Sequence, residues 1–318
     1  MNKTTERLFE SHEIRKTKKQ KSAFIDFVSA GAEELGYECR VEKGSLGSRN
    51  VVVGKIDSAN VVYTAHYDTC PRLPFPNFIT PKNMLVYVLY QFALVGVIFL
   101  AATLVELLVC AVLALFIESD AALTAITGIS GYLTVIGALL LMLLGPANKH
   151  TANDNTSGVS LLLRVMEELP EELRGTVAFV FFDLEEVGLI GSSSFASKHK
   201  EEMKNKLLLN FDCVSDGENI LFALKRGAAP YKGAISEAFA ERDGYKVQVL
   251  DKGVFYPSDQ AAFPLGVGVC ALKSTRGGLL YMNRIHTGRD TVYNEENVDF
   301  LTNGAIKLLK IVNNNKSK

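Results

Sequence analysis

Two long apolar segments between residues 84 and 145 restrict most strongly what this chain can fold into. Residues 84–117 contain one charged side chain, Glu106, and residues 121–145 contain none. About 20 apolar residues span a bilayer as a helix, whereas a helix of a soluble protein usually keeps one polar face. The sequence therefore predicts a two-helix, hydrophobic transmembrane hairpin as an insertion at residues 83–145. The alternative is a buried helical cap or a dimerisation hairpin in a soluble protein.

The charges that flank the insertion predict its orientation. Three basic residues, Arg72, Lys82 and Lys149, lie at the end that the two segments share. Two acidic residues, Glu118 and Asp120, lie at the turn between the segments. The positive-inside rule then places the rest of the chain in the cytoplasm. We expect a multi-pass membrane protein with two helices. We expect Glu106 at the far interface, where a carboxylate costs little; the alternative is an intramembrane carboxylate with a functional role.

Composition excludes several classes of protein. The net charge is −1, from 34 Lys and Arg against 35 Asp and Glu, so no nucleic-acid partner is expected. Hydrophobic residues make up 48% of the chain, enough for a sizeable core. The five cysteines are widely spaced and predict neither a disulfide framework nor a CxxC zinc motif. The basic stretch at residues 1–22 and three histidines, His12, His150 and His199, are interpreted as solvated surface.

Outside the insertion, strand and helix patterns alternate. Apolar runs typical of strands occupy residues 50–54, 61–66, 177–183, 207–212, 220–224, 247–250 and 267–272. Helical spacing of apolar residues occurs at 23–35, 157–169 and 297–312. This alternation predicts an α/β fold, a mixed, mostly parallel sheet sandwiched by helices. Residues 1–82 and 146–318 would form one discontinuous domain that the insertion interrupts.

Five polar clusters follow predicted strands or open a predicted helix. They lie at residues 66–68, 153–158, 183–186, 210–212 and 285–291. Ligands of open α/β sheets bind at the carboxyl ends of the strands, so these clusters are expected to converge. The candidate metal ligands that they supply are His66, Asp154, Glu186, Asp212 and His286.

This set of side chains suits a pair of zinc ions. Imidazoles and carboxylates are zinc ligands, and two ions about 3.5–4 Å apart need about five protein ligands, one of them bridging. The three carboxylates carry −3 and two Zn²⁺ ions carry +4, so a net positive charge remains at the site. This charge favours a zinc-bridging hydroxide, which is the nucleophile that hydrolysis needs. Glu185 is free to act as general base. Asp68 is placed to accept the second imidazole N–H of His66 and to set its tautomer.

The ordered combination resembles the di-zinc aminopeptidase family, metallopeptidase family twenty-eight, over most of the chain apart from residues 84–145. The stretches that carry it are VYTAHYDT at 62–69, NDNTSGV at 153–159, FDLEEVGLIGS at 182–192, NFD at 210–212, SD at 258–259 and IHT at 285–287. The resemblance implies a zinc-exopeptidase-like fold. It also implies His66 and Asp212 on one zinc, Glu186 and His286 on the other, Asp154 as the bridge, and Glu185 as the base.

Several features depart from the family or lie close to the site. Asp68 and Asp154 are 86 positions apart because the insertion separates them. Gln260 follows Ser-Asp where relatives often have His. Tyr256 is a candidate oxyanion donor, with a packed tyrosine as the alternative. The cysteines beside proposed ligands, Cys70 and Cys213, are either thiolate ligands or small buried residues.

The function expected is that of a membrane-anchored di-zinc metallopeptidase, by default an aminopeptidase, with a peptide substrate and the bilayer as partners. Alternatives are a di-zinc carboxypeptidase or amidohydrolase, a one-zinc glutaminyl cyclase, and a non-catalytic membrane partner on the same fold. A homo-oligomer formed through the hairpin is a further alternative. Because His66 precedes the insertion and Asp154 follows it, the chain must cross the membrane twice or not at all.

Overall fold

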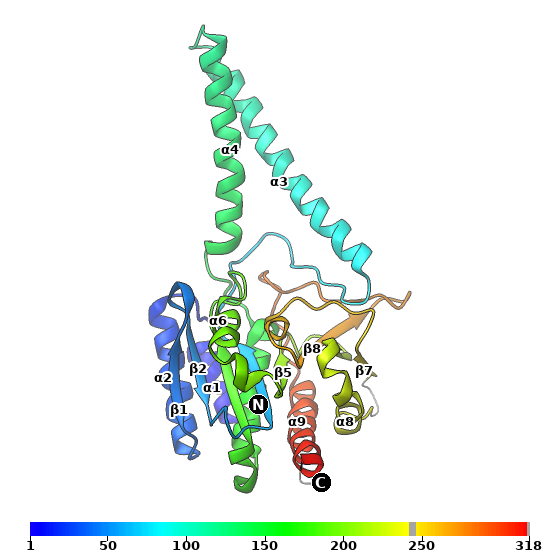
Figure 1. Cartoon of the computed structure of the whole chain (residues 1–318). Helices are drawn as coiled ribbons and strands as arrows, with labels where there is room; N and C mark the ends of the chain where they lie inside the picture. The colour runs from blue at the N-terminus through cyan, green and yellow to red at the C-terminus, as the bar shows by residue number, and fades with distance from the viewer. Residues whose placement is uncertain (242–245, 317–318) are drawn as a thin grey trace.

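The strands of the chain form one mixed sheet (Figure 1). In the computed structural model, which describes residues 1–241 and 246–316, the strand order is β1-β2-β4-β3-β5-β8-β6-β7, and β9 pairs with β8. The strands are β1 (Cys39–Lys43), β2 (Arg49–Val53), β3 (Val61–His66), β4 (Val177–Phe182), β5 (Leu207–Phe211), β6 (Asn219–Leu224), β7 (Lys246–Leu250), β8 (Gly266–Ser274) and β9 (Leu280–Tyr281).

Four neighbouring strands at the centre of the sheet, β4, β3, β5 and β8, run parallel. Tyr63 of β3 lies between Phe179 of β4 and Leu209 of β5. The chain therefore leaves β3 for β4 on one side and later returns to β5 on the other side. Such a reversal of strand order opens a crevice at the carboxyl ends of the strands, where ligands bind in α/β sheets.

Helices cover both faces of the sheet (Figure 1). One face packs against α1 (Lys3–His12), α2 (Lys18–Glu34), α5 (Gly158–Glu168), α8 (Lys232–Ala238) and α9 (Glu295–Lys316). The other face packs against α6 (Ile190–Lys198) and α7 (Lys200–Met203). Because both faces of the central strands are buried, their sequences are continuous apolar runs. The predicted α/β fold with a mixed, mostly parallel sheet is confirmed.

Two basic residues of the N-terminal segment are buried, so the prediction of a solvated basic face was wrong for them. Arg15 is completely buried, and its guanidinium donates to the carbonyl oxygens of Tyr67 and His12 and to Thr156 Oγ1. Lys21 forms a buried ion pair with Asp183. The N-terminal segment is therefore tied to the loops that follow β3 and β4.

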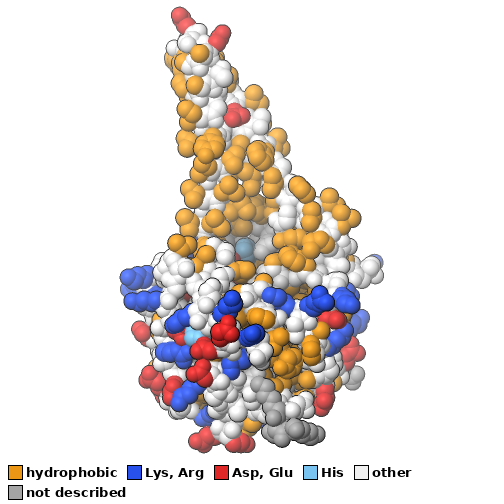
Figure 2. Space-filling view, viewed as in Figure 1, with side chains coloured by type: hydrophobic (Ala, Val, Ile, Leu, Met, Phe, Trp, Pro, Cys, Tyr) orange, Lys and Arg blue, Asp and Glu red, His pale blue; other side chains and the backbone are white. Residues whose placement is uncertain are grey.

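The insertion forms two long helices, α3 (Met84–Leu113) and α4 (Asp120–Leu144), that project from the rest of the molecule (Figure 1). At ~1.5 Å per residue each exceeds the ~30 Å of a bilayer core. Figure 2 shows them covered by hydrophobic side chains. Only 6% of the most apolar 18-residue window of each helix is buried. This exposure counts against the buried-cap alternative, because a core helix would be mostly covered.

Small residues mark the contact between the two helices. Ala102 of α3 and Gly131 of α4 are the buried residues of these helices. A Cβ atom at Gly131 would lie 1.7 Å from Glu106 Oε1, so the Glu106 carboxylate lies directly against the α4 backbone. Close approach through small residues is a common mode of packing between membrane helices. Glu106 therefore faces the partner helix.

The foot of the hairpin is joined to loops at the carboxyl edge of the sheet. Isolated bridges pair Pro71 with Ala147 and Ile79 with Met282. Tyr90 of α3 donates its hydroxyl to the carbonyl of Pro76 at 2.6 Å. The hairpin thus emerges beside the end of the sheet at which the polar clusters are expected.

Candidate metal centre

His66, at the end of β3, lies between two carboxylates from separate segments. Its Nε2 atom is 3.2 Å from Asp154 Oδ1 and 3.5 Å from Asp212 Oδ1. Asp212 follows β5, and Asp154 lies in a π-helical turn, Ala152–Ser157, that leads into α5. All three residues are buried. They form one group of three potential metal ligands.

The second oxygen of Asp154 faces a second histidine. His286 Nε2 is 3.3 Å from Asp154 Oδ2 and 3.2 Å from Glu186 Oε2. Each carboxylate oxygen of Asp154 therefore faces a different imidazole. The structure brings together all five predicted ligands, in the two groups that the resemblance implies, with Asp154 shared between them.

A network of backbone hydrogen bonds holds the loop of Asp154. The Asp290 carboxylate accepts the backbone N–H groups of Asn153 and Asp154 at 2.9 and 3.0 Å. The Asn153 side chain accepts the N–H groups of Ser215 and Asp216 at 2.7 and 3.0 Å. The neighbouring asparagines of this motif thus position the aspartate, and Asp290 had no role assigned from the sequence.

Asp68 holds the loop of the two glutamates. Its carboxylate accepts the backbone N–H groups of Glu185 and Glu186 at 3.0 and 3.2 Å. The distance from His66 Nδ1 to Asp68 Oδ1 is 3.6 Å, longer than a hydrogen bond. The predicted hydrogen bond from the His66 imidazole is therefore not formed. Asp68 instead joins the ends of β3 and β4 at the positions of the glutamates.

The carboxylates and histidines shift one another's pKa values. Burial alone would lower the pKa of His66, but the surrounding carboxylates, above all Glu185 and Asp154, raise it well above its ordinary value. Burial would raise the pKa of Asp154, but hydrogen bonds from His286 and His66 lower it. Each carboxylate–imidazole contact therefore stabilises the charged forms in the absence of a cation.

In three further carboxyl groups the attraction of His66 does not offset burial and the neighbouring carboxylates. Burial, then repulsion from nearby carboxylates, raises the pKa of Glu185 and of Glu186 well above the ordinary value. Burial also raises the pKa of Asp259 to about 7. Asp259 is fully buried, and its two oxygens have no hydrogen-bond partner among the described residues. The centre thus concentrates more acidic groups than its histidines neutralise.

The loops of the site are held in conformations that side chains rarely adopt. Of the five non-glycine residues with positive φ in the described ranges, four flank the site: Leu184 (56°), Leu189 (58°), Cys213 (58°) and His286 (62°). Such conformations cost free energy, and they cluster at functional sites. Leu73 donates its backbone N–H to the His286 carbonyl at 2.7 Å, which stabilises the strained loop.

The five ligands and Glu185 open into a cavity of about 260 Å³. Its wall also includes Asn77 and Ile79, from the segment that leads into α3, together with Leu189 and Ile285. The sequence analysis did not identify the residues from the hairpin foot, because their local sequence has no motif. In the described part of the chain, no Lys or Arg lines this cavity.

Most of the other residues singled out in the sequence form hydrogen bonds within the protein and are buried. The Tyr256 hydroxyl donates to the Asp212 carbonyl at 3.0 Å, which favours the packed-tyrosine alternative. Gln260 donates to the Tyr256 carbonyl at 2.6 Å and is buried. His199 is also buried, contrary to prediction, because its ring bonds to the carboxylates of Glu42 and Glu202. His150 is exposed and His12 is half-buried.

The donor set fits zinc. Glu186 Oε1 is buried with no hydrogen-bond partner in the described ranges. Buried polar atoms normally have partners, and an excess of buried carboxylates requires a cation. Imidazole nitrogens combined with carboxylate oxygens are typical zinc ligands. The chain's own residues therefore leave ligand atoms and negative charge for a divalent cation.

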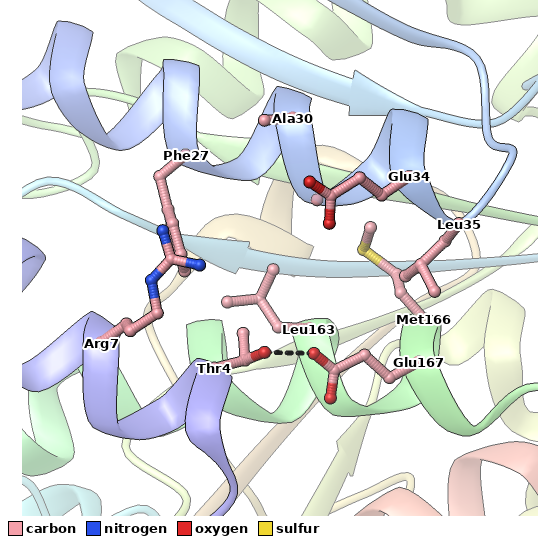
Figure 3. A pocket seen from close by; sticks show the side chains of 10 residues that line it. Thr4, Arg7, Phe27, Ala30, Glu34, Leu35, Leu163, Met166 and Glu167 are labelled. Atoms are coloured by element: carbon pink, nitrogen blue, oxygen red, sulfur yellow. Dashed lines mark hydrogen bonds between the residues drawn. The ribbon is translucent and has the colours of Figure 1, made fainter.

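Another cavity lies between α1, α2 and α5 (Figure 3). There the Thr4 hydroxyl donates to Glu167, and the Arg7 guanidinium lies 5.4 Å from the ring centroid of Phe27. Among the described residues that line this cavity there is no histidine, no cysteine and none of the predicted site residues. It therefore offers no alternative metal centre.

Comparisons with known proteins agree with this geometry. The model of peptidase family M28 matches residues 138–308, a range that includes Asp154, Glu186, Asp212 and His286. A search of curated proteins gives no match.

Solved structures with the same fold include two hydrolases and a cyclase. A Zn-dependent exopeptidase from Parabacteroides distasonis has a TM-score of 0.57 and 14% identity, covering 96% of this chain and 94% of the other. Porphyromonas gingivalis glutaminyl cyclase has a TM-score of 0.56 and 16% identity, covering 97% and 96%. The Legionella pneumophila LapA aminopeptidase has a TM-score of 0.55 and 14% identity, covering 96% and 69%.

Proposed function

The chain belongs to peptidase family M28, and we propose that it is a membrane-anchored aminopeptidase whose centre holds two zinc ions. One observation carries the proposal of two ions: the two oxygens of Asp154 face different histidines, at 3.2 and 3.3 Å. His66 and Asp212 would hold one ion, Glu186 and His286 the other, and Asp154 both.

When bound, zinc supplies a Lewis acid for the scissile carbonyl and a water of lowered pKa. Glu185 lines the cavity beside the ligands, and burial favours the protonated form of its carboxyl group. Beside bound zinc ions the pKa of Glu185 would be lower, which favours the carboxylate; this carboxylate would take a proton from the attacking water and, once protonated, deliver it to the nitrogen of the leaving amine. Asp68 positions Glu185 through the backbone N–H that it accepts.

The residues that line the cavity support an aminopeptidase over a carboxypeptidase. A free α-amino group donates hydrogen bonds and needs acceptors, which the carboxylate oxygens in the lining supply. A C-terminal carboxylate would need a Lys or Arg, and the described lining of the cavity contains neither. Ile79, Leu189 and Ile285 provide an apolar wall. We therefore propose peptides with a free N-terminus and an apolar first residue as substrates.

Membrane anchoring is proposed from the exposure of the hairpin. Large apolar side chains such as Leu107, Leu108 and Phe116 are 61%, 65% and 78% exposed. An apolar surface of this extent on a soluble monomer would favour aggregation, whereas lipid would cover it. The flanking charges support a cytoplasmic position for the remainder of the chain.

Metal analysis and a peptide panel test the proposal. Purified full-length protein is expected to contain two zinc ions per chain and to release residues from peptides with a free N-terminus, but not from N-acetylated ones. Glu185→Gln should reduce kcat by roughly 10²–10⁴-fold, while the control Glu34→Gln should be active. Intact activity of Glu185→Gln would refute the role of Glu185.

A glutaminyl cyclase is the second candidate, since cyclases are among the structures with this fold. Ammonia released from peptides that begin with Gln, without any free amino acid, would favour it. Zinc stoichiometry separates the candidates further. One ion per chain would argue for the cyclase and against the proposed pair.

A further inference from the structure

The thiol of Cys70 lies among the ligands proposed for one zinc ion. Its Sγ atom, one oxygen each of Asp154 and Glu186, and a ring nitrogen of His286 all lie within 4.8 Å of one another. Ligand atoms around a tetrahedral zinc are about 3.3–3.6 Å apart, given Zn–N or Zn–O bonds near 2.05 Å and Zn–S bonds near 2.3 Å. Small side-chain movements would therefore bring all four atoms onto one ion.

The backbone around Cys70 is held by the same loops that carry His286. The Cys70 carbonyl accepts the backbone N–H of Asn148 at 2.9 Å. The Asn148 side chain donates to the Thr287 carbonyl at 2.9 Å. Asn148 is fully buried, and it joins the segment after β3 to the segment of His286. The position of the thiol is therefore set by the fold rather than by a flexible loop.

Two observations indicate that this thiol faces a ligand. Glu186, a member of the same group, has its Oε1 atom buried without a hydrogen-bond partner in the described ranges. Cys213 is also buried beside the centre, but its thiol donates to Asp212 Oδ1 at 3.2 Å, and it belongs to none of the ligand groups. Cys213 lines the cavity of the centre, but of these two cysteines only Cys70 has its sulfur grouped with ligand atoms of Asp154, Glu186 and His286.

We propose that Cys70 is a thiolate ligand of the zinc held by Glu186 and His286. The inference rests on the proposed two-zinc centre. On binding, the thiol loses its proton to solvent, and sulfur donates an electron pair to the metal without any change of oxidation state. The zinc ion held by Glu186 and His286 then has four protein ligands, counting Asp154 and Cys70. The zinc ion held by His66 and Asp212 has three, counting Asp154.

The unequal ligand counts have two consequences. Zinc positions with four protein ligands are closed, whereas positions with three keep a place for water or substrate. The open place therefore lies on the ion of His66 and Asp212, so the attacking water would be held by that ion alone and not by both, unlike the bridging hydroxide expected from the sequence. The carboxylates of Asp154, Glu186 and Asp212 together with the thiolate carry −4, which balances the +4 of two zinc ions.

Cobalt substitution tests the proposal by spectroscopy instead of activity. The full-length chain, purified in detergent and freed of metal, is titrated with two equivalents of Co²⁺. Wild type is expected to develop a near-ultraviolet thiolate-to-cobalt charge-transfer band. Cys70→Ser and Cys70→Ala should lose this band, and the matched control Cys213→Ser should keep it. His286→Ala should also lose it, because the same ion loses a second ligand.

The outcomes separate this inference from the proposed function. Two bound cobalt ions without the band in wild type would overturn the thiolate ligand and leave the two-metal centre intact. Retention of the band in Cys70→Ser, or its loss in Cys213→Ser alone, would also overturn the inference. Failure of wild type to bind cobalt or zinc would overturn both. Because the wild-type spectrum is itself decisive, the test stands even when a variant does not fold.

Discussion

The Asp290 carboxylate accepts a 3.0 Å hydrogen bond from the backbone N–H of Asp154, the residue proposed to bridge two metal ions. Its other oxygen accepts the N–H of Asn153 at 2.9 Å. Burial and the nearby Asp154 raise the pKa of Asp290 to about 7. Asp290 therefore acts on the centre through the backbone of the bridging residue, without lining the cavity.

Asp290→Ala should weaken metal binding. Two backbone N–H groups lose their acceptor, and the loop of Asp154 is free to move. Loss of such supporting groups typically costs roughly 10–100-fold in metal affinity or activity. Competition with a zinc chelator measures the affinity, and the exposed Asp57→Ala serves as control. Equal affinities of Asp290→Ala and wild type would contradict this role.

Arg15→Met should destabilise the fold. The guanidinium is completely buried and satisfies the carbonyl of Tyr67 and the hydroxyl of Thr156, near the metal centre. Each buried acceptor left without a donor costs about 1–3 kcal/mol, so for two acceptors we expect a loss of about 2–6 kcal/mol in unfolding free energy. The exposed Lys19→Met should change it by less than about 0.5 kcal/mol. Denaturant titration measures both unfolding free energies, and an Arg15→Met variant as stable as wild type would refute the prediction.

Asp259 should make the metal-free protein less stable as pH rises. Its pKa increases from 3.8 to about 7 on folding, so between these values the folded state keeps a proton that the unfolded state has lost. Stability therefore falls with rising pH across this window. Asp259→Asn removes the effect, and its stability relative to wild type should rise by up to about 4 kcal/mol from pH 4 to pH 7. If the unfolding free energies of Asp259→Asn and wild type changed in parallel with pH, Asp259 would not contribute this pH dependence.

Replacing residues 84–144 with a short Gly/Ser linker should release the protein from membranes without unfolding the rest. The bridges from Pro71 to Ala147 and from Ile79 to Met282 join the foot of the hairpin to the sheet independently of α3 and α4. We expect the variant in the soluble fraction, with turnover of small soluble peptides retained. Continued sedimentation with membranes would show that another surface anchors the chain.

Ser119→Cys should be labelled from outside the cell by a membrane-impermeant maleimide. Ser119 is exposed at the turn between α3 and α4, and the proposed orientation places this turn opposite the cytoplasm. Wild type provides the background, because its five cysteines are buried or half-buried. Labelling only after cell lysis would place this turn on the cytoplasmic side, which means that the orientation is reversed or that the hairpin does not cross the membrane.

The central strands were predictable because burial on both faces requires continuous apolar runs, as in Val177–Phe182. Strand β1 was not predicted, because in Cys39–Lys43 only Glu42 is buried and charged residues interrupt the pattern. The five ligands were found because each follows a strand or opens a helix. Asn148 was missed because its local sequence carries no signal for partners far along the chain. Asp259 and Asp290 lay in stretches that the sequence singled out, but their partners, and so their roles, depend on the tertiary structure.

The order of apolar and polar residues along the chain was sufficient to predict the sheet, the hairpin and the ligand types, since periodicity and residue chemistry are local properties. Distances are not local. His66 and His286 are 220 positions apart in the sequence, yet each faces one oxygen of Asp154. The burial of Arg15, the partners of Asp68 and the direction of the Cys70 thiol likewise depend on segments that only packing brings into contact.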